Sequence, residues 1–194
     1  MRTAIRVILG GILAGLAVFF WGFVAHMFTP IGSMGMKAMP QEAALSAMMK
    51  TSISDSGFYV FPKPDFEMKL NAEESKTLAE KIAKGPTGIL IVQPQGARLA
   101  LPQQLGFELA SNIAAAILAA ILLSRTQLPL IGRVLFVTTL GLFGWFSVCA
   151  SQWTWYAFPT DFTFAALIDE VGGFLVAGIV LALIFRPVPA KLEA

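Results

Sequence analysis

Charged residues are scarce in this chain of 194 residues. Only 13% are Asp, Glu, Lys or Arg, whereas ordinary soluble domains carry about 25%, and 56% are hydrophobic. The formal net charge is only +2, and because the basic residues form no stripe, nucleic acid is not expected as a partner. The single cysteine, Cys149, excludes an intrachain disulfide framework and a cysteine-only metal site. The composition indicates an integral membrane protein.

Signatures of catalysis are also missing. The sequence contains no G-x-S-x-G elbow, Walker loop, H-E-x-x-H pair or C-x-x-C pair. The only histidine is His26, and nothing in the sequence places a serine or Cys149 beside it. We therefore predict a protein that is not an enzyme and needs no cofactor.

Four apolar stretches are each long enough to cross a bilayer core, which takes about 20 helical residues. They are residues 7–27, 105–124, 134–151 and 162–185. The first resembles a signal peptide, but its apolar run is longer than a signal sequence needs and no A-x-A-type cleavage site follows. We predict a retained anchor, residues 1–27, and an all-α transmembrane bundle of four helices.

The basic residues beside the spans predict the orientation of the bundle. They all fall on one side of the four stretches, the side expected to be cytoplasmic. These residues are Arg2, Arg6, Arg125, Arg133, Arg186 and Lys191. Both termini, including the tail 186–194, are then cytoplasmic, and residues 28–104 are extracytoplasmic. The link on the opposite side has no base and carries Trp153, Trp155 and Tyr156, which are expected to anchor the bundle at the membrane interface.

The long connection between the first two spans has structural signals of its own. Residues 41–50 read as a short helix, and Asn71 is placed to cap a second helix that stops at Gly85. Residues 57–61 and 88–94 are rich in β-forming residues and bounded by Gly and Pro, so they are expected to pair. We predict a small α+β cap. It would bury little apolar surface alone, so it is expected to lean on the outer ends of the helices.

Polar residues recur at one depth in the predicted spans. Counting from Arg125 and Arg186 at 1.5 Å per residue places Glu108 and Asp169 about 25 Å above the inner interface. The layer at this depth comprises Glu108, Asn112, Gln152, Asp169 and Glu170, with Ser111, Ser147, Ser151 and His26 nearby. Asp169 and Glu170 are about 100° apart on a helix, so they cannot face one partner squarely. We interpret the layer as contacts with the cap, neighbouring helices or a partner subunit.

Two other readings of this layer stay open. His26 with carboxylates on facing helices is the ligand set of a metal centre in a helix bundle, although the usual Glu-x-x-His pair is missing. A proton or ion path is the second alternative, but no acid or base continues it through the inner half of the spans.

Methionines gather just outside the first span. Thioethers are soft ligands that select Cu(I), and the M-x-M-x-x-M spacing is compatible with copper capture. The candidate ligands are His26, Met27, Met34, Met36 and Met39. Packing at the membrane surface explains the same residues without a metal, because methionine is an adaptable apolar filler.

Small residues in the spans predict close helix packing. The patterns are Gly11-x-x-x-Gly15, the alanines between 114 and 120, Gly141-x-x-Gly144 and Gly173-x-x-x-Ala177. They suit a compact bundle and docking onto another membrane subunit equally well.

Two segments, FFWGFVAHMFTPIG and WTWYAFPTDFTFAALIDEVGGFL, resemble a family of small bacterial membrane proteins with four spans and a large first outer loop. The resemblance implies a bacterial inner-membrane location but no activity. In the second segment, Pro159 is placed to end the Trp-rich link, and Thr160 or Asp161 to cap the last span.

The function expected from these features is that of an accessory or scaffold subunit of a larger membrane assembly. Its partners would be membrane lipids and other membrane protein subunits. The alternatives are a metal-handling protein that uses copper or another metal ion, and transport of a lipid or small molecule by an oligomer.

Overall fold

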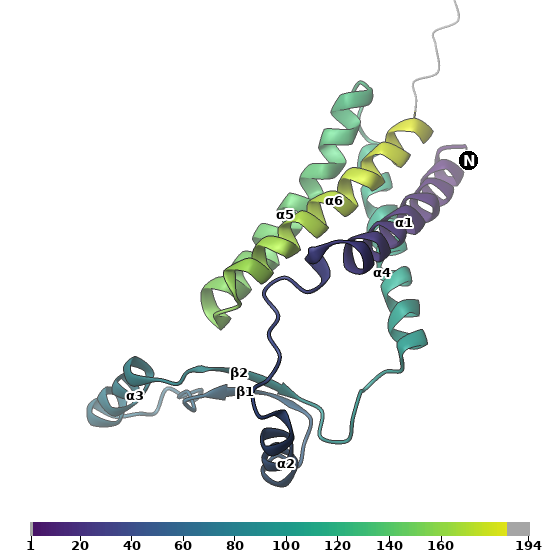
Figure 1. The fold of residues 1–194 in the computed structure, drawn as a ribbon. Helices are drawn as coiled ribbons and strands as arrows, with labels where there is room; N and C mark the ends of the chain where they lie inside the picture. The colour runs from purple at the N-terminus through teal and green to yellow at the C-terminus, as the bar shows by residue number, and fades with distance from the viewer. Residues whose placement is uncertain (1, 186–194) are drawn as a thin grey trace, which may run out of the picture. The chain divides into compact units, whose positions relative to one another are not determined.

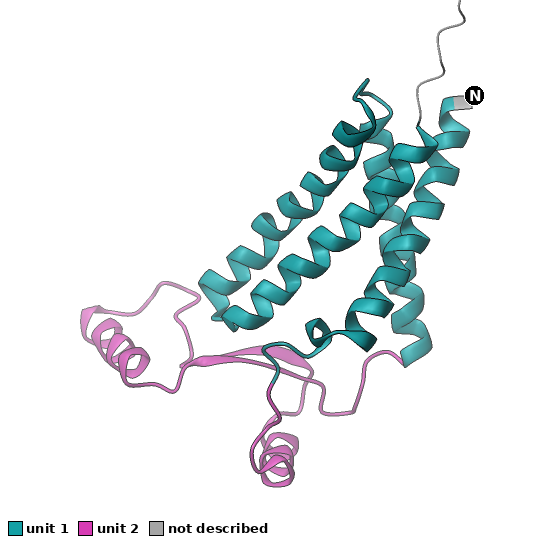
Figure 2. Ribbon diagram, turned by 45° about the horizontal axis from the view of Figure 1, so that its top comes forward, with its two compact units in different colours: residues 1–36, 101–194 teal, residues 37–100 magenta. Residues whose placement is uncertain are grey.

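The computed structural model describes residues 2–185 and is mostly helical. The elements in chain order are α1 (Arg2–Phe28), the 3-10 turn η1 (Pro30–Gly32), α2 (Glu42–Ser52), β1 (Gly57–Phe61), α3 (Ala72–Lys84), β2 (Gly88–Val92), α4 (Leu101–Leu123), α5 (Leu130–Tyr156) and α6 (Thr160–Ile184) (Figure 1). They divide into two compact units, one of residues 1–36 with 101–194 and the other of residues 37–100 (Figure 2).

Helices α1, α4, α5 and α6 are each long and apolar enough to cross a membrane. The prediction of four spans is therefore confirmed, and the chain is a multi-pass membrane protein by the length and composition of its helices. The spans are longer than their apolar stretches. Helix α4 begins at Leu101 instead of residue 105, and α5 covers Leu130–Tyr156 instead of 134–151.

The longer α5 corrects two predictions. Trp153, Trp155 and Tyr156 belong to the helix and not to a link, because polar and aromatic residues lower the hydropathy without ending the hydrogen-bonded ladder. The helix ends where Ala157 takes a left-handed conformation, with φ of 55°. Arg133, expected to border the inner link, lies inside the first turns of α5 and is buried.

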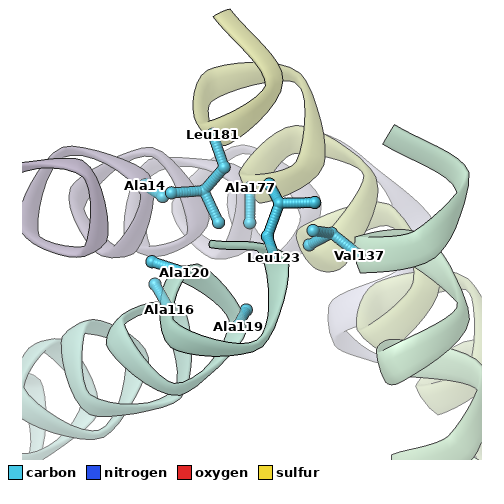
Figure 3. Packing of buried hydrophobic residues seen from close by; sticks show 8 residues of the cluster. All are labelled: Ala14, Ala116, Ala119, Ala120, Leu123, Val137, Ala177 and Leu181. Carbon is cyan, nitrogen blue, oxygen red and sulfur yellow. The ribbon is translucent and has the colours of Figure 1, made fainter. Parts of the chain in front are cut away.

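The membrane helices pack in the order α5, α6, α1, α4, with α4 held mainly by α1. They converge around a small core at the end where α4 stops and α5 begins (Figure 3). The core residues are Ala14, Ala116, Ala119, Ala120, Leu123, Val137, Ala177 and Leu181. All buried residues of α4 lie in its second half, and the first half of α4 diverges from α6 (Figure 1). The bundle is closed at one end and splayed at the other.

The predicted close packing of small residues is confirmed between α1 and α4. A Cβ atom on Gly11 would lie 2.7 Å from the Cα of Ile117, and one on Gly15 would lie 2.7 Å from the backbone nitrogen of Ile113. Since these atoms belong to the backbone of α4, only glycine permits this approach. The pair of glycines therefore sets the separation of the two helices.

The unit of residues 37–100 has the predicted α+β composition. Strands β1 and β2 pair antiparallel, with Gly57 opposite Val92 and Phe61 opposite Gly88. Helix α3 is capped by Asn71, whose side chain accepts hydrogen bonds from the backbone N–H groups of Glu73 and Glu74. Glu74 completes a capping box by accepting the N–H of Asn71. The predicted pairing of the two strands and the predicted helix cap at Asn71 are thus confirmed.

This unit has no core of its own. None of residues 37–100 is buried, although many of them are large and apolar. The exposed apolar residues include Phe58, Phe61, Phe66, Met68, Ile82 and Ile91. Two strands and two short helices are too few to enclose a hydrophobic interior, which agrees with the expectation that the segment buries little surface alone.

Replacing Asn71 by Ala should loosen the start of α3. The substitution removes the acceptor for two backbone N–H groups, and loss of such a cap costs about 0.5–2 kcal/mol. We expect the backbone amides of the first turn of α3 to exchange with deuterium several-fold faster in the full chain. Ser75→Ala, in the same turn but without a capping role, is the matched control, and equal exchange in both variants would contradict the prediction.

Candidate functional site

Asp169 of α6 is held by two side chains of α1. The indole N–H of Trp21 donates to the Asp169 Oδ1 at 3.0 Å and to the backbone oxygen of Asp169 at 3.1 Å. The Nε2 of His26 lies 3.0 Å from the Asp169 Oδ2. The two side chains are partly open, with 54% of His26 and 30% of Asp169 exposed. Both carboxylate oxygens of Asp169 therefore have a partner, and the contacts join α1 to α6.

A glycine on α6 makes room for this arrangement. A Cβ atom on Gly172 would lie 2.7 Å from the Cε2 of Trp21, so the indole ring lies directly against the α6 backbone. The ring is then positioned to reach the carboxyl group of Asp169, about one turn earlier on α6. The local sequence Asp-Glu-Val-Gly thus supplies an acceptor and the space for its donor.

Glu108 and Asn112 form a second polar pair, one turn apart on α4. The amide Nδ2 of Asn112 donates to the Glu108 Oε1 at 3.3 Å. Ser111 donates its hydroxyl to the backbone oxygen of Glu108 and leaves the carboxylate untouched. The Glu108 carboxylate thus receives a long hydrogen bond from a neutral amide of its own helix.

Glu170 points away from Asp169, as their angular separation on the helix predicts. Its Oε1 lies 3.1 Å from the position that a Cβ on Gly144 of α5 would take. Across the part of the chain that the structure describes, no hydrogen bond or ion pair reaches the Glu170 carboxylate. A carboxylate in a membrane-spanning helix is costly to leave in hydrocarbon, and Glu170 is such a group.

Two adjoining cavities bring these groups together between α1, α4 and α6. The first has a volume of about 230 Å³ and is lined by Trp21, Glu108, Asn112, Asp169 and Glu170, among others. The second, of about 450 Å³, shares Glu108, Asn112 and Asp169 with the first and extends to His26 and apolar side chains. We call the joint space, bordered by Glu108, Asn112, Asp169 and Glu170, the acidic groove. It occupies the splayed half of the bundle.

The remaining polar residues of α5 do not border either of these cavities. Gln152 is half-buried near the end of α5, and Ser147 donates its hydroxyl to the backbone oxygen of Phe143 on its own helix. Ser151 is exposed. The structure thus brings the predicted polar residues of α1, α4 and α6 together and leaves those of α5 outside.

The predicted interface anchors lie around the turn between α5 and α6. Trp155 is 78% exposed, and Tyr156 and Asp161 are exposed as well. The indole N–H of Trp153 donates to the hydroxyl of Thr160 at 3.2 Å. The N-terminal cap of α6 differs from the prediction.

Pro159, and neither Thr160 nor Asp161, occupies the N-cap position of α6. No side chain provides a capping hydrogen bond there. The Pro159 carbonyl accepts both the backbone N–H and the hydroxyl of Thr163, so the chain enters the helix one residue earlier than predicted.

The candidate metal ligands are spread over several places. Met27 borders the larger cavity with His26, whereas Met36 borders a separate cavity with His26 and Asp169. Met34 borders neither, and Met39 belongs to the other compact unit. Within residues 2–185 no group of three or more His, Cys, Asp or Glu side chains is arranged to hold a metal ion.

Sequence reasoning missed the contact of Trp21 and His26 with Asp169. The residues are about 145 positions apart, so no local spacing indicates the pair. Counting residues along each span placed His26 and Asp169 at neighbouring depths in the membrane. This similarity in depth was the signal in the sequence that pointed to the contact. Residues 19–32 and 153–175 supply all three side chains and meet here. Against known proteins, the chain matches no family model, no curated protein and no solved structure.

Proposed function

We propose that this protein is a non-catalytic accessory or scaffold subunit of a larger assembly in the bacterial inner membrane. In this proposal the closed end of the bundle faces the cytoplasm and residues 37–100 are extracytoplasmic. The support for the orientation is the position of Arg2, Arg6, Arg125 and Arg133, which all lie toward the closed end. Arg186 and Lys191, which also entered the prediction, lie outside the described residues.

The observation that carries the proposal is the absence of a core between residues 37 and 100. Exposed large apolar side chains are costly where they meet water, and large apolar patches typically mark interaction surfaces. The two-stranded sheet also leaves an unpaired edge on each strand within the described residues, which another chain can pair with. A partner subunit would satisfy both features.

The acidic groove gives the proposal independent support from the membrane side. Glu108 and Glu170 lie in membrane-spanning helices without a cationic partner among the described residues of the bundle unit, 2–36 and 101–185. Ionised groups at such positions usually face protein or water instead of lipid. A neighbouring subunit is a natural cover for them.

A metal-handling protein is the second candidate, and one observation favours it. The imidazole of His26 lies against the Asp169 carboxylate, and Met27 and Met36 border the cavities on either side of His26. Imidazole, carboxylate and thioether are all metal-binding groups, although they favour different ions. The same experiment separates the two candidates.

The test is native mass spectrometry of the protein, extracted in mild detergent from its own membranes without a chelator. We expect the protein to be bound to other subunits, with a lower yield of the complex in Asp169→Ala and Glu170→Ala. Ser147→Ala, which removes a hydroxyl bonded only within its own helix, is the control. An unaltered complex yield in both acidic variants overturns the scaffold proposal. A bound metal that disappears in His26→Ala supports the metal candidate instead.

A further inference from the structure

We propose that the acidic groove receives a basic side chain from a transmembrane helix of the partner subunit. This inference rests on the proposed function and adds the chemistry of the partner. It predicts a partner span that is apolar except for one Lys or Arg, which meets Glu108 and Glu170 in the outer half of the membrane.

The first argument is charge. Three carboxylates border the groove, and only Asp169 has a basic neighbour, His26. Neither Glu108 nor Glu170 forms an ion pair with another residue of the bundle unit within 2–36 and 101–185. The arginines of the bundle lie toward its closed end, so they are far from the groove along the helices. The groove therefore has two uncompensated acids, and a basic group complements them.

The second argument is the way the groove is bordered. Its lining combines the polar side chains with large apolar ones, including Phe23, Met27 and Leu105, which are about half exposed or more. A lining that is apolar with a few polar groups matches the surface of a membrane helix that carries a single polar residue. A water-soluble ligand would instead favour a mainly polar lining.

The third argument is space. A Cβ atom on Gly22, which lines both cavities, would meet no atom within 4 Å. The first half of α4 has no buried residue and lies away from α6. The adjoining cavities of about 230 and 450 Å³ give a long side chain room to enter.

Energetics favour a pair over isolated charges. An unpaired charge within a membrane helix is costly, so the acid and the base are each unfavourable before assembly. Charge-assisted hydrogen bonds between them form only in the complex. The same residues that disfavour the separate chains in the membrane thus favour their association.

The decisive experiment places a photoreactive amino acid at Ala115, which borders the groove, in the full chain in its own membranes. A probe at Phe143, an exposed position on α5, is the matched control. We expect the Ala115 probe to cross-link an apolar span with one Lys or Arg. The double variant Glu108→Gln, Glu170→Gln should reduce this product about tenfold, as loss of a charge-assisted hydrogen bond implies.

A charge exchange makes the test specific. Glu108→Lys should lose the product, and replacing the identified Lys or Arg of the partner by Glu should restore it. Cross-links to lipid only, to a second copy of this chain or to a span without a base overturn the inference. So does a product that persists after both acids are neutralised. If native mass spectrometry in those cases still finds a complex whose yield falls in Asp169→Ala or Glu170→Ala, the scaffold function stands and only the docking mode is wrong.

Discussion

Replacing Gly15 by Ala will force α1 away from α4 and sharply lower the thermal stability of the detergent-solubilised protein. The added methyl group would overlap the backbone of Ile113, which cannot rotate away as a side chain does. Overpacking of this kind costs about 1–3 kcal/mol, and the conflict with the backbone places Gly15 at the upper end. Fluorescence-detected size-exclusion chromatography after heating measures the effect.

Gly22→Ala is the control for the same substitution in the same helix. A Cβ atom there meets nothing within 4 Å, and alanine favours a helix over glycine by up to about 1 kcal/mol. This variant should be as stable as the parent protein or more stable. Equal losses in both variants would show that helix flexibility, and not the approach of α4, requires the glycines.

Asp169→Ala will destabilise the isolated protein, because it removes the acceptor shared by Trp21 and His26. Hydrogen bonds to charged groups contribute about 1.5–3 kcal/mol each, and the exposure of His26 places its bond at the lower end. The contacts between α1 and α6 in the splayed half of the bundle should loosen first. Thermal unfolding in detergent and hydrogen exchange of α1 around Trp21 would measure the loss.

Glu170→Ala is the matched comparison one residue away. Its carboxylate has no hydrogen-bond or ion-pair partner in the described chain, so the isolated protein should keep its stability. The same change should weaken the assembled complex. Comparable destabilisation of the isolated protein by both substitutions would mean that the two acids have the same structural role, which contradicts the geometry.

Local signals predicted much of the fold. Asn71, Glu74 and Gly85 delimit α3 because a helix cap is made by residues that are adjacent in sequence. Strands β1 and β2 were found for a similar reason, since Gly and Pro bound two short runs of β-forming residues. The apolar lengths identified four membrane helices, but they placed the end of α5 too early because hydropathy and helicity end at different residues.

The candidate site was only partly predictable. Counting residues along each span placed Glu108, Asp169 and His26 at similar depths in the membrane. Such a count contains no information about which faces of the helices contact one another. That Trp21 donates to Asp169, and that Gln152 lies outside the groove, depends on the rotation of packed helices. The order α5, α6, α1, α4 is a tertiary property, and small residues on every span permit several such orders.

The absence of a core in residues 37–100 has a consequence for the life of the protein in the cell. Proteases act on chain segments whose local free energy of unfolding is near zero, and a segment without buried side chains has little to oppose opening. Copies that have not joined an assembly would then be degraded first. Under the proposed scaffold function, we expect the abundance of this protein to follow that of the partner subunit, so that stoichiometry is set by turnover and not by synthesis alone.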